Sequence, residues 1–222
     1  MSGGLPPPQP LVSRAGRFLV IHEESFTGVT ISSNVYVLES DRFYVFDAGG
    51  RPDLASFLRA CGIEEGRIGA IFLTHGHYDH VTGLRSLRQF EVPTFISTKD
   101  AALLESSVQG AGAIEVSCEG PARILESIGI EKIDTPGHTP GSVCYLSKPD
   151  RTLISGDTVF SEGFFGRTDL PGGSDAQMIA SLESLSRMGI DAILPGHGMY
   201  TMEGGSDALK TALSNAKCLL VP

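Results

Sequence analysis

The residues best suited to chemistry are concentrated in one short segment, which reads THGHYDH from position 74. His75 and His77 are two residues apart on a predicted extended loop, so both side chains project to the same side and can share one ion. Asp79 and His80 follow where we expect the backbone to turn into a helix, which aims them toward a second ion. Gly76 permits the tight path because it has no side chain. The spacing therefore predicts a site for two neighbouring metal ions.

Three further residues can complete this site. His138 lies in the segment PGHT, Asp157 in SGDT and His197 in PGHG, and each follows a predicted strand in a glycine-containing loop. Loops at the ends of several strands can converge on one edge of a sheet. We expect His138 to complete the shell of the first ion, His197 that of the second, and the Asp157 carboxylate to bridge both.

Five imidazoles and two carboxylates favour two divalent ions, with zinc as the first expectation and iron or manganese as alternatives. Ions in such pairs lie roughly 3.5–4 Å apart and hold a hydroxide between them at neutral pH. That metal-bridging hydroxide is the expected nucleophile, and turnover is expected to depend on Asp79 and Asp157. Structural zinc sites are usually closed Cys/His tetrahedra, and no cysteine lies in these segments. The pattern therefore favours a catalytic site.

The rest of the chain predicts a layered α/β fold with helices outside sheets. The predicted strands cover residues 17–23, 33–39, 42–47, 68–73, 94–97, 122–126, 130–135, 142–147, 152–155 and 191–194. The predicted helices cover residues 54–61, 80–88, 99–105, 174–187 and 205–216. Residues 106–121 are predicted to be a loop, residues 1–12 a disordered tail, and residues 13–222 a single domain.

Composition narrows the classes of partner. The 222 residues carry a formal net charge of −9, which would repel nucleic acid at long range. No apolar run reaches the ~18 residues of a membrane span, and no signal peptide precedes the first strand. The 4 cysteines are widely spaced, which is typical of reduced thiols inside a cell. We therefore expect a cytoplasmic protein that acts on a small molecule, and no oligomeric state is predicted.

Together, the four segments around the histidines and Asp157 resemble the signature of the metallo-β-lactamase superfamily. The resemblance runs from Thr74 to Gly198. It implies a four-layer αββα sandwich, with two mixed sheets, helices on the outer faces and the metal site at the edge where the sheets meet.

The loop after Asp157 narrows the resemblance further. Its run Gly-Arg-x-Asp-x-Pro-Gly-Gly, which contains Arg167 and Asp169, resembles the short glyoxalase II-like (hydroxyacylglutathione hydrolase-like) enzymes. Those enzymes hydrolyse thioesters such as S-lactoylglutathione, so a thioester is the expected substrate. We predict that Arg167 and Asp169 form a buried ion pair that braces the loop, or else hold the metal ligands in orientation. Phe164 and Phe165 are expected either to line the substrate pocket or to belong to the core.

The resemblance is incomplete at the C-terminal end. Full-length glyoxalase II has a helical domain that helps to bind glutathione, whereas only residues 199–222 follow the last metal-binding segment here. The thiol carrier of the substrate is therefore left open.

Other activities of the same superfamily stay as alternatives. Persulfide dioxygenases share the fold and a similar loop but use one iron, held by the equivalents of His75, His138 and Asp157, a set suited to non-haem Fe²⁺. A lactonase or another ester hydrolase is also possible, as is a metal-loaded scaffold without turnover. A true β-lactamase is disfavoured because many of those enzymes have arginine at the position of His80 and are exported.

Overall fold

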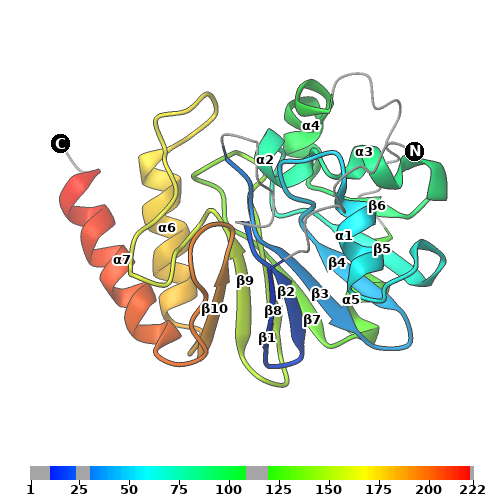
Figure 1. Ribbon diagram of the computed structural model, residues 1–222. Helices are drawn as coiled ribbons and strands as arrows, with labels where there is room; N and C mark the ends of the chain where they lie inside the picture. The colour runs from blue at the N-terminus through cyan, green and yellow to red at the C-terminus, as the bar shows by residue number, and fades with distance from the viewer. Residues whose placement is uncertain (1–10, 24–30, 109–119, 221–222) are drawn as a thin grey trace.

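Two β-sheets packed face to face form the centre of the computed structural model, and helices cover their outer faces (Figure 1). The structure describes residues 11–23, 31–108 and 120–220. The first sheet has the order β1-β2-β3-β4-β5-β6, in which β1 to β4 are antiparallel and β4, β5 and β6 run parallel. Its strands are β1 (Val12–Ala15), β2 (Phe18–Ile21), β3 (Val35–Glu39), β4 (Phe43–Phe46), β5 (Ile68–Phe72) and β6 (Thr94–Phe95).

The second sheet has the order β10-β9-β8-β7. Strands β9 and β10 are parallel, and the other pairs are antiparallel, so both sheets are mixed. Its strands are β7 (Ile130–Asp134), β8 (Val143–Ser147), β9 (Thr152–Gly156) and β10 (Ala192–Pro195).

Strand β4 shows how the layers are built. Successive side chains of a strand point to opposite faces. Tyr44 and Phe46 accordingly enter the cluster between the two sheets, whereas Phe43 and Val45 enter the cluster beneath the helices. All four side chains are buried, which explains why this strand reads as a continuous apolar run.

The helices lie on the outer faces of the sandwich, as Figure 1 shows. On the first sheet lie α1 (Leu54–Ala60), α2 (Tyr78–Val81), α3 (Leu84–Leu87) and α4 (Ala101–Ser107), with the 3₁₀ turns η2 (Glu65–Arg67), η3 (Arg88–Phe90) and η4 (Thr98–Asp100). On the second sheet lie α6 (Asp175–Ser186) and α7 (Gly205–Leu219). The helix α5 (Pro121–Ser127) packs beside β7. The predicted four-layer αββα sandwich is confirmed.

One predicted strand is wrong, because residues 122–126 belong to helix α5. Pro121 occupies the first turn of this helix, where its missing N–H costs nothing and its fixed φ favours helix formation. Leu125 and Ile128 then lie one turn apart and both enter the cluster between the sheets. In this short segment the apolar side chains fit either period, so alternation alone did not distinguish helix from strand.

The predicted helix over residues 80–88 is interrupted. It divides into α2, α3 and the turn η3. Gly83 lies between the first two, and a side chain there would collide with the carbonyl of Ala48 and come within 2.9 Å of Leu54. The close approach of this segment to the loop after β4 therefore shapes the break.

The N-terminal end differs from its prediction. Strand β1 was not predicted, and it begins at Val12, within the proposed tail of residues 1–12. Residues 1–10 of that tail lie outside the described residues. Cys61, Cys144 and Cys218 are free thiols, as expected, while Cys118 is outside the described residues. In the part of the chain that the structure describes, no helix combines the length and apolar character needed to cross a bilayer.

Candidate metal centre

Strand ends bring the predicted ligands to one edge of the sandwich. Strand β5 ends two residues before Thr74, β9 ends directly before Asp157, and β10 ends two residues before His197. His138 lies in the loop between β7 and β8. Because β9 and β10 are parallel and Gly156 pairs with Pro195 after a register shift at Leu194, Asp157 and His197 emerge side by side.

All seven predicted ligands converge at this edge. Their ligand atoms form three overlapping groups, each within 4.8 Å. The groups are His75, His77 and His138; His75, His80 and Asp157; and Asp79, His80 and His197.

The first group matches the shell predicted for one ion. The Nδ1 of His77 lies 2.9 Å from the Nε2 of His138. The ring of His75 lies 4.8 Å, centroid to centroid, from each of the other two rings. Three imidazole nitrogens thus face a common point and could hold one ion.

The second group matches the shell predicted for the other ion. The Nε2 of His197 lies 3.2 Å from Oδ2 of Asp79, and the Nε2 of His80 lies 4.0 Å from the same oxygen. Helix α2 begins at Tyr78, so the backbone turn brings Asp79 and His80 toward His197. The ring of His80 also lies 4.1 Å, centroid to centroid, from that of His75, so the two groups adjoin.

Asp157 lies between the two groups. Its Oδ1 is 3.3 Å from the Nε2 of His80, and its Oδ2 is 3.6 Å from the Nε2 of His138 and 3.5 Å from that of His197. One carboxylate therefore reaches ligands of both groups, which is the arrangement that a bridging ligand requires.

Buried ligand atoms without a partner test whether the site suits cations. The Nε2 atoms of His75 and His80 and the Oδ1 of Asp157 are buried and have no hydrogen-bond partner. Leaving such atoms unpaired costs about 1–3 kcal/mol each. They all face the site, and imidazole nitrogen and carboxylate oxygen are ordinary ligands of Zn²⁺ and Fe²⁺. The donor set therefore fits divalent metal ions.

A buried aspartate orients His80. The Nδ1 of His80 donates to Oδ2 of Asp47 over 2.8 Å, and both side chains are almost fully buried. The backbone N–H of Thr74 donates to Oδ1 of the same carboxylate over 2.8 Å. The contact leaves the Nε2 of His80 free to face the site.

Two more ligands are oriented in the same way. Glu23 accepts from the Nδ1 of His197 over 2.8 Å and from the backbone N–H of Gly198 over 2.9 Å. The Nδ1 of His138 donates to the backbone carbonyl of Arg167 over 2.7 Å. Carboxylate and carbonyl acceptors of this kind fix the tautomer of a ligating histidine.

Asp100 ties two ligand-bearing loops together. Its fully buried carboxylate accepts from the backbone N–H of Gly76 over 3.0 Å, from the hydroxyl of Thr139 over 2.7 Å and from the backbone N–H of Gly141 over 2.7 Å. The loop of His75 and His77 and the loop of His138 are thereby held in a fixed relation.

The sequence reasoning missed Asp47, Glu23 and Asp100. Asp47 offered one signal, because an acidic residue directly after a buried apolar strand and just before a glycine pair is unusual. Glu23 lies 174 residues from its partner His197, and nothing in the spacing links the two.

The carboxylates and imidazoles perturb one another strongly. Burial opposes the charged form of His80, but the nearby Asp47 and Asp157 outweigh it and raise its pKa to about 10. Burial also opposes the charged form of His197, yet hydrogen bonds to Asp157, Asp79 and Glu23 raise its pKa to about 12. Without metal, both imidazoles are therefore in the cationic form, with a proton on each ring nitrogen. Metal binding must displace the proton from the nitrogen that faces the site.

Other groups of the site shift in the opposite direction. Burial, reinforced by the neighbouring His80, lowers the pKa of His75 well below its usual value. Burial likewise lowers the pKa of His77, with a further contribution from His138. Burial would raise the pKa of Asp157, but His80 and His197 hold it well below its usual range. Neutral imidazoles and an ionised carboxylate are the forms that bind metal.

The loop after Asp157 differs from its prediction. Arg167 and Asp169 do form a bidentate ion pair, with N–O distances of 2.8 and 2.7 Å. The predicted burial is wrong, because both side chains are 68% exposed. Such a pair contributes little to stability, and it is the backbone carbonyl of Arg167 that contacts a candidate ligand. Phe164 is exposed and Phe165 packs against the cluster under α6 and α7.

The sequence is similar to one known protein family and to several of its members. A family model described as Metallo-beta-lactamase superfamily matches residues 28–197. The chain is 33% identical to the "Probable metallo-hydrolase YqgX" of Bacillus subtilis over 77% of its own length and 87% of that protein. It is also 33% identical to the "Probable metallo-hydrolase MJ0888" of Methanocaldococcus jannaschii, over 77% of its own length and 90% of that protein.

Solved structures resemble the chain as well. The structure of TTHA1623, solved in a di-iron-bound form, is 28% identical, with a TM-score of 0.66 over 79% of this chain and 92% of that one. The B3 metallo-beta-lactamase BLEG-1 is 29% identical, with a TM-score of 0.62 over 76% of this chain and 88% of that one.

Proposed function

Because the chain belongs to the metallo-beta-lactamase superfamily, we propose that this metallo-hydrolase is a dinuclear enzyme that cleaves thioesters. The convergence of two ligand groups on Asp157, with buried ligand atoms that lack any other partner, is the observation that carries the proposal. Bound divalent cations would acidify a water molecule and polarise the carbonyl of the substrate.

Zinc and iron are the two metals to distinguish. The donor set suits either ion. The similar protein TTHA1623 has been solved with two irons, which supports a pair of ions and keeps iron as an alternative to zinc.

The residues of the chain itself would keep the site in one geometry. Asp157 would hold the two halves together, while Asp47, Glu23 and the carbonyl of Arg167 keep three imidazoles in the required tautomer. Asp100 would keep two of the loops at a constant separation. Such preorganisation lets the site act on a substrate without reorganising first.

The loops around the site favour a thioester that is not highly charged. The loops of residues 74–80, 135–142, 157–174 and 196–204 contain a single lysine or arginine, Arg167, and its guanidinium is paired with Asp169. Among the exposed large apolar side chains are Tyr78, Phe164 and Met199, one from each of three of these loops. Apolar groups of this kind suit an acyl chain or an uncharged thiol better than the two carboxylates of glutathione.

Metal analysis combined with a thioester screen tests this proposal. Protein purified without added metal is analysed for zinc, iron and manganese, and S-acyl thioesters of a neutral thiol are compared with S-lactoylglutathione. We expect two ions per chain, turnover that a chelator abolishes and metal restores, and a higher kcat/KM for the neutral thioester. Asp79→Ala and Asp157→Ala should remove turnover, whereas Asp207→Ala, an exposed aspartate on α7, should not.

Several results would contradict the proposal. One iron per chain, with oxygen consumed in the presence of a persulfide, would indicate a dioxygenase. Turnover of lactones or β-lactams without turnover of thioesters would retain the hydrolase but reject the substrate class. Full activity of Asp157→Ala would reject dinuclear hydrolysis.

A further inference from the structure

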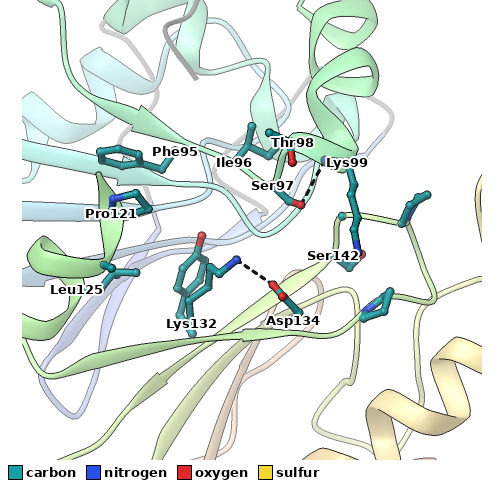
Figure 2. Close-up of a pocket in the computed structure, with 15 residues that line it drawn as sticks. Phe95, Ile96, Ser97, Thr98, Lys99, Pro121, Leu125, Lys132, Asp134 and Ser142 are labelled. Atoms are coloured by element: carbon teal, nitrogen blue, oxygen red, sulfur yellow. Dashed lines mark hydrogen bonds and ion pairs between the residues drawn. The ribbon is translucent and has the colours of Figure 1, made fainter. Parts of the chain in front are cut away.

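A cavity of about 290 Å³ opens between the end of the first sheet and strand β7, beside the loop that contains His138 (Figure 2). Its walls come from the β6–η4 segment, from α5, from β7 and from the turn before β8. Of the described residues that line it, none belongs to the seven candidate metal ligands. The proposed hydrolysis does not use this cavity.

The two ends of the cavity differ in chemistry. Figure 2 shows Phe95, Pro121 and Leu125 gathered at one end, and Lys99, Asp134 and Ser142 toward the other. The hydroxyl of the buried Tyr145 already donates to the carbonyl of Leu73. Tyr145 therefore offers the cavity only its apolar ring. One end is therefore apolar and the other is polar.

The polar end carries an excess of positive charge. Lys132 pairs with Asp134 over 2.8 Å, whereas Lys99, which is exposed, makes no ion pair with the described part of the chain. Two ammonium groups against one carboxylate thus line the cavity, while the buried carboxylate of Asp100 lies behind the wall, where N–H and O–H groups of Gly76, Thr139 and Gly141 bond it. The excess of ammonium groups in the lining is notable in a chain whose formal net charge is −9, and it attracts an anion.

The walls of the cavity are held in place before any ligand arrives. Residues 97–99 and 140–142 line it on either side of the buried Asp100, whose carboxylate bonds the backbone N–H of Gly141 over 2.7 Å. The hydroxyl of Ser142 is engaged with Thr139 over 2.7 Å. Preformed concave sites that are mostly apolar with a few polar groups are typical of small-molecule binding.

We propose that this cavity binds a small amphipathic monoanion, whose hydrocarbon body lies against Phe95 and Leu125 and whose anionic group lies beside Lys99 and Lys132. The size of the cavity suits a short hydrocarbon chain or a single aromatic ring. The charge selects an anion over a cation or a neutral molecule of the same shape. The site is separate from the metal centre and does not depend on the reaction proposed there.

Binding of hexane-1-sulfonate to the full-length, metal-loaded protein tests the proposal. A sulfonate stays ionised and is a poor metal ligand, which separates this site from the metal centre. Calorimetry gives the affinity, and amide chemical shifts give the place. We expect saturable binding, shifts centred on Ser97, Leu125 and Lys132, and no comparable binding of hexylammonium.

Variants make the test specific. Lys99→Glu should weaken sulfonate binding by about tenfold, because it replaces an attraction by a repulsion. Ala122→Phe fills part of the cavity from an exposed position of α5 and should abolish binding without disturbing the core. Lys210→Glu, an exposed lysine on α7, serves as the matched control and should bind as the parent does.

Three outcomes would overturn the proposal. The first is equal binding of hexylammonium and hexane-1-sulfonate. The second is the same loss of affinity in Lys99→Glu and Lys210→Glu, which would indicate an effect of net charge alone. The third is an absence of saturable binding, or shifts confined to the loops of the metal ligands.

Discussion

The carboxylate of Asp47 holds the Nδ1 of His80 at 2.8 Å in a part of the molecule from which solvent is excluded. The same carboxylate receives the backbone N–H and the hydroxyl of Thr74, so it links the end of strand β5 to the start of helix α2. A residue outside the seven candidate ligands can therefore determine which nitrogen of His80 is free to bind a metal ion.

Asp47→Asn is expected to weaken metal binding by about 10–100-fold while the fold persists. The amide oxygen can still accept from Thr74, but an amide nitrogen facing His80 would donate to its Nδ1 and move the imidazole proton to Nε2. Asparagine is the suitable replacement because Asp47 has a φ of 59°, which asparagine tolerates better than alanine. Competition with a chromogenic chelator measures the affinity, and circular dichroism checks the fold.

An unchanged metal affinity in Asp47→Asn would contradict this role for the aspartate. Asp53→Asn provides the control, because Asp53 pairs with Arg51 near the start of α1 and contacts none of the candidate ligands in the described part of the chain. Its metal affinity should equal that of the parent.

Glu23→Gln is expected to cause a smaller loss, of a few-fold in metal affinity. Glu23 orients His197 by a bond of the same length, 2.8 Å, but both side chains are about one quarter exposed. Water can therefore replace part of the lost contact. Metal titrations should give the lowest affinity for Glu23→Ala, an intermediate affinity for Glu23→Gln and the highest affinity for the control Glu203→Gln, which changes an exposed residue. A metal affinity of Glu23→Ala equal to that of the control would show that the carboxylate does not orient His197.

Metal binding should release protons. His80, with a pKa of about 10, and His197, with a pKa of about 12, are both protonated at pH 8 in the metal-free protein, and both must be neutral to bind a cation. Apparent metal affinity should therefore rise with pH between about 6 and 9, since competition by protons weakens. A pH indicator in weakly buffered solution should record the release when zinc is added, and His80→Gln should release less. A metal affinity independent of pH over this range would contradict the expectation.

The same shifts predict how the metal-free fold responds to pH. A pKa raised above the unfolded value of 6.5 contributes stability that is present below that pH and is lost as pH rises through the folded value. The contribution of His80 should thus decline from about pH 6.5 toward about pH 10. Thermal unfolding of the chelated protein should show a lower Tm at pH 9.5 than at pH 7.5. A higher Tm at pH 9.5 than at pH 7.5 would contradict this expectation.

The convergence of the seven candidate ligands could be predicted from the sequence because they lie in four short segments, each of which follows a strand. Their supporting residues could not, since hydrogen bonds such as that from His197 to Glu23 join positions 174 residues apart. Such contacts depend on how the two sheets pack against each other, which the local spacing of residue types does not predict.

The fold was predictable where burial imposes a clear period. The outer helix α6 buries Met178, Leu182 and Leu185 at helical spacing and was predicted within one residue at each end. Helix α5 was misread because seven residues with few apolar positions do not distinguish a period of 3.6 from a period of 2. Tertiary contact of Leu125 with the cluster between the sheets settles its conformation.

Gly196→Ala should damage the metal centre directly. A methyl group at this position would collide with Oδ1 of Asp157 and come within 2.6 Å of Cε1 of His80, so the added atom would enter the space between the two ligand groups. We expect loss of at least one ion per chain, with turnover reduced in proportion, while the sandwich remains folded because the clash falls on the site. Gly66→Ala is the matched control, since a side chain there would meet nothing within 4 Å. Two tightly held ions in Gly196→Ala would show that Asp157 and His80 do not share the metal centre.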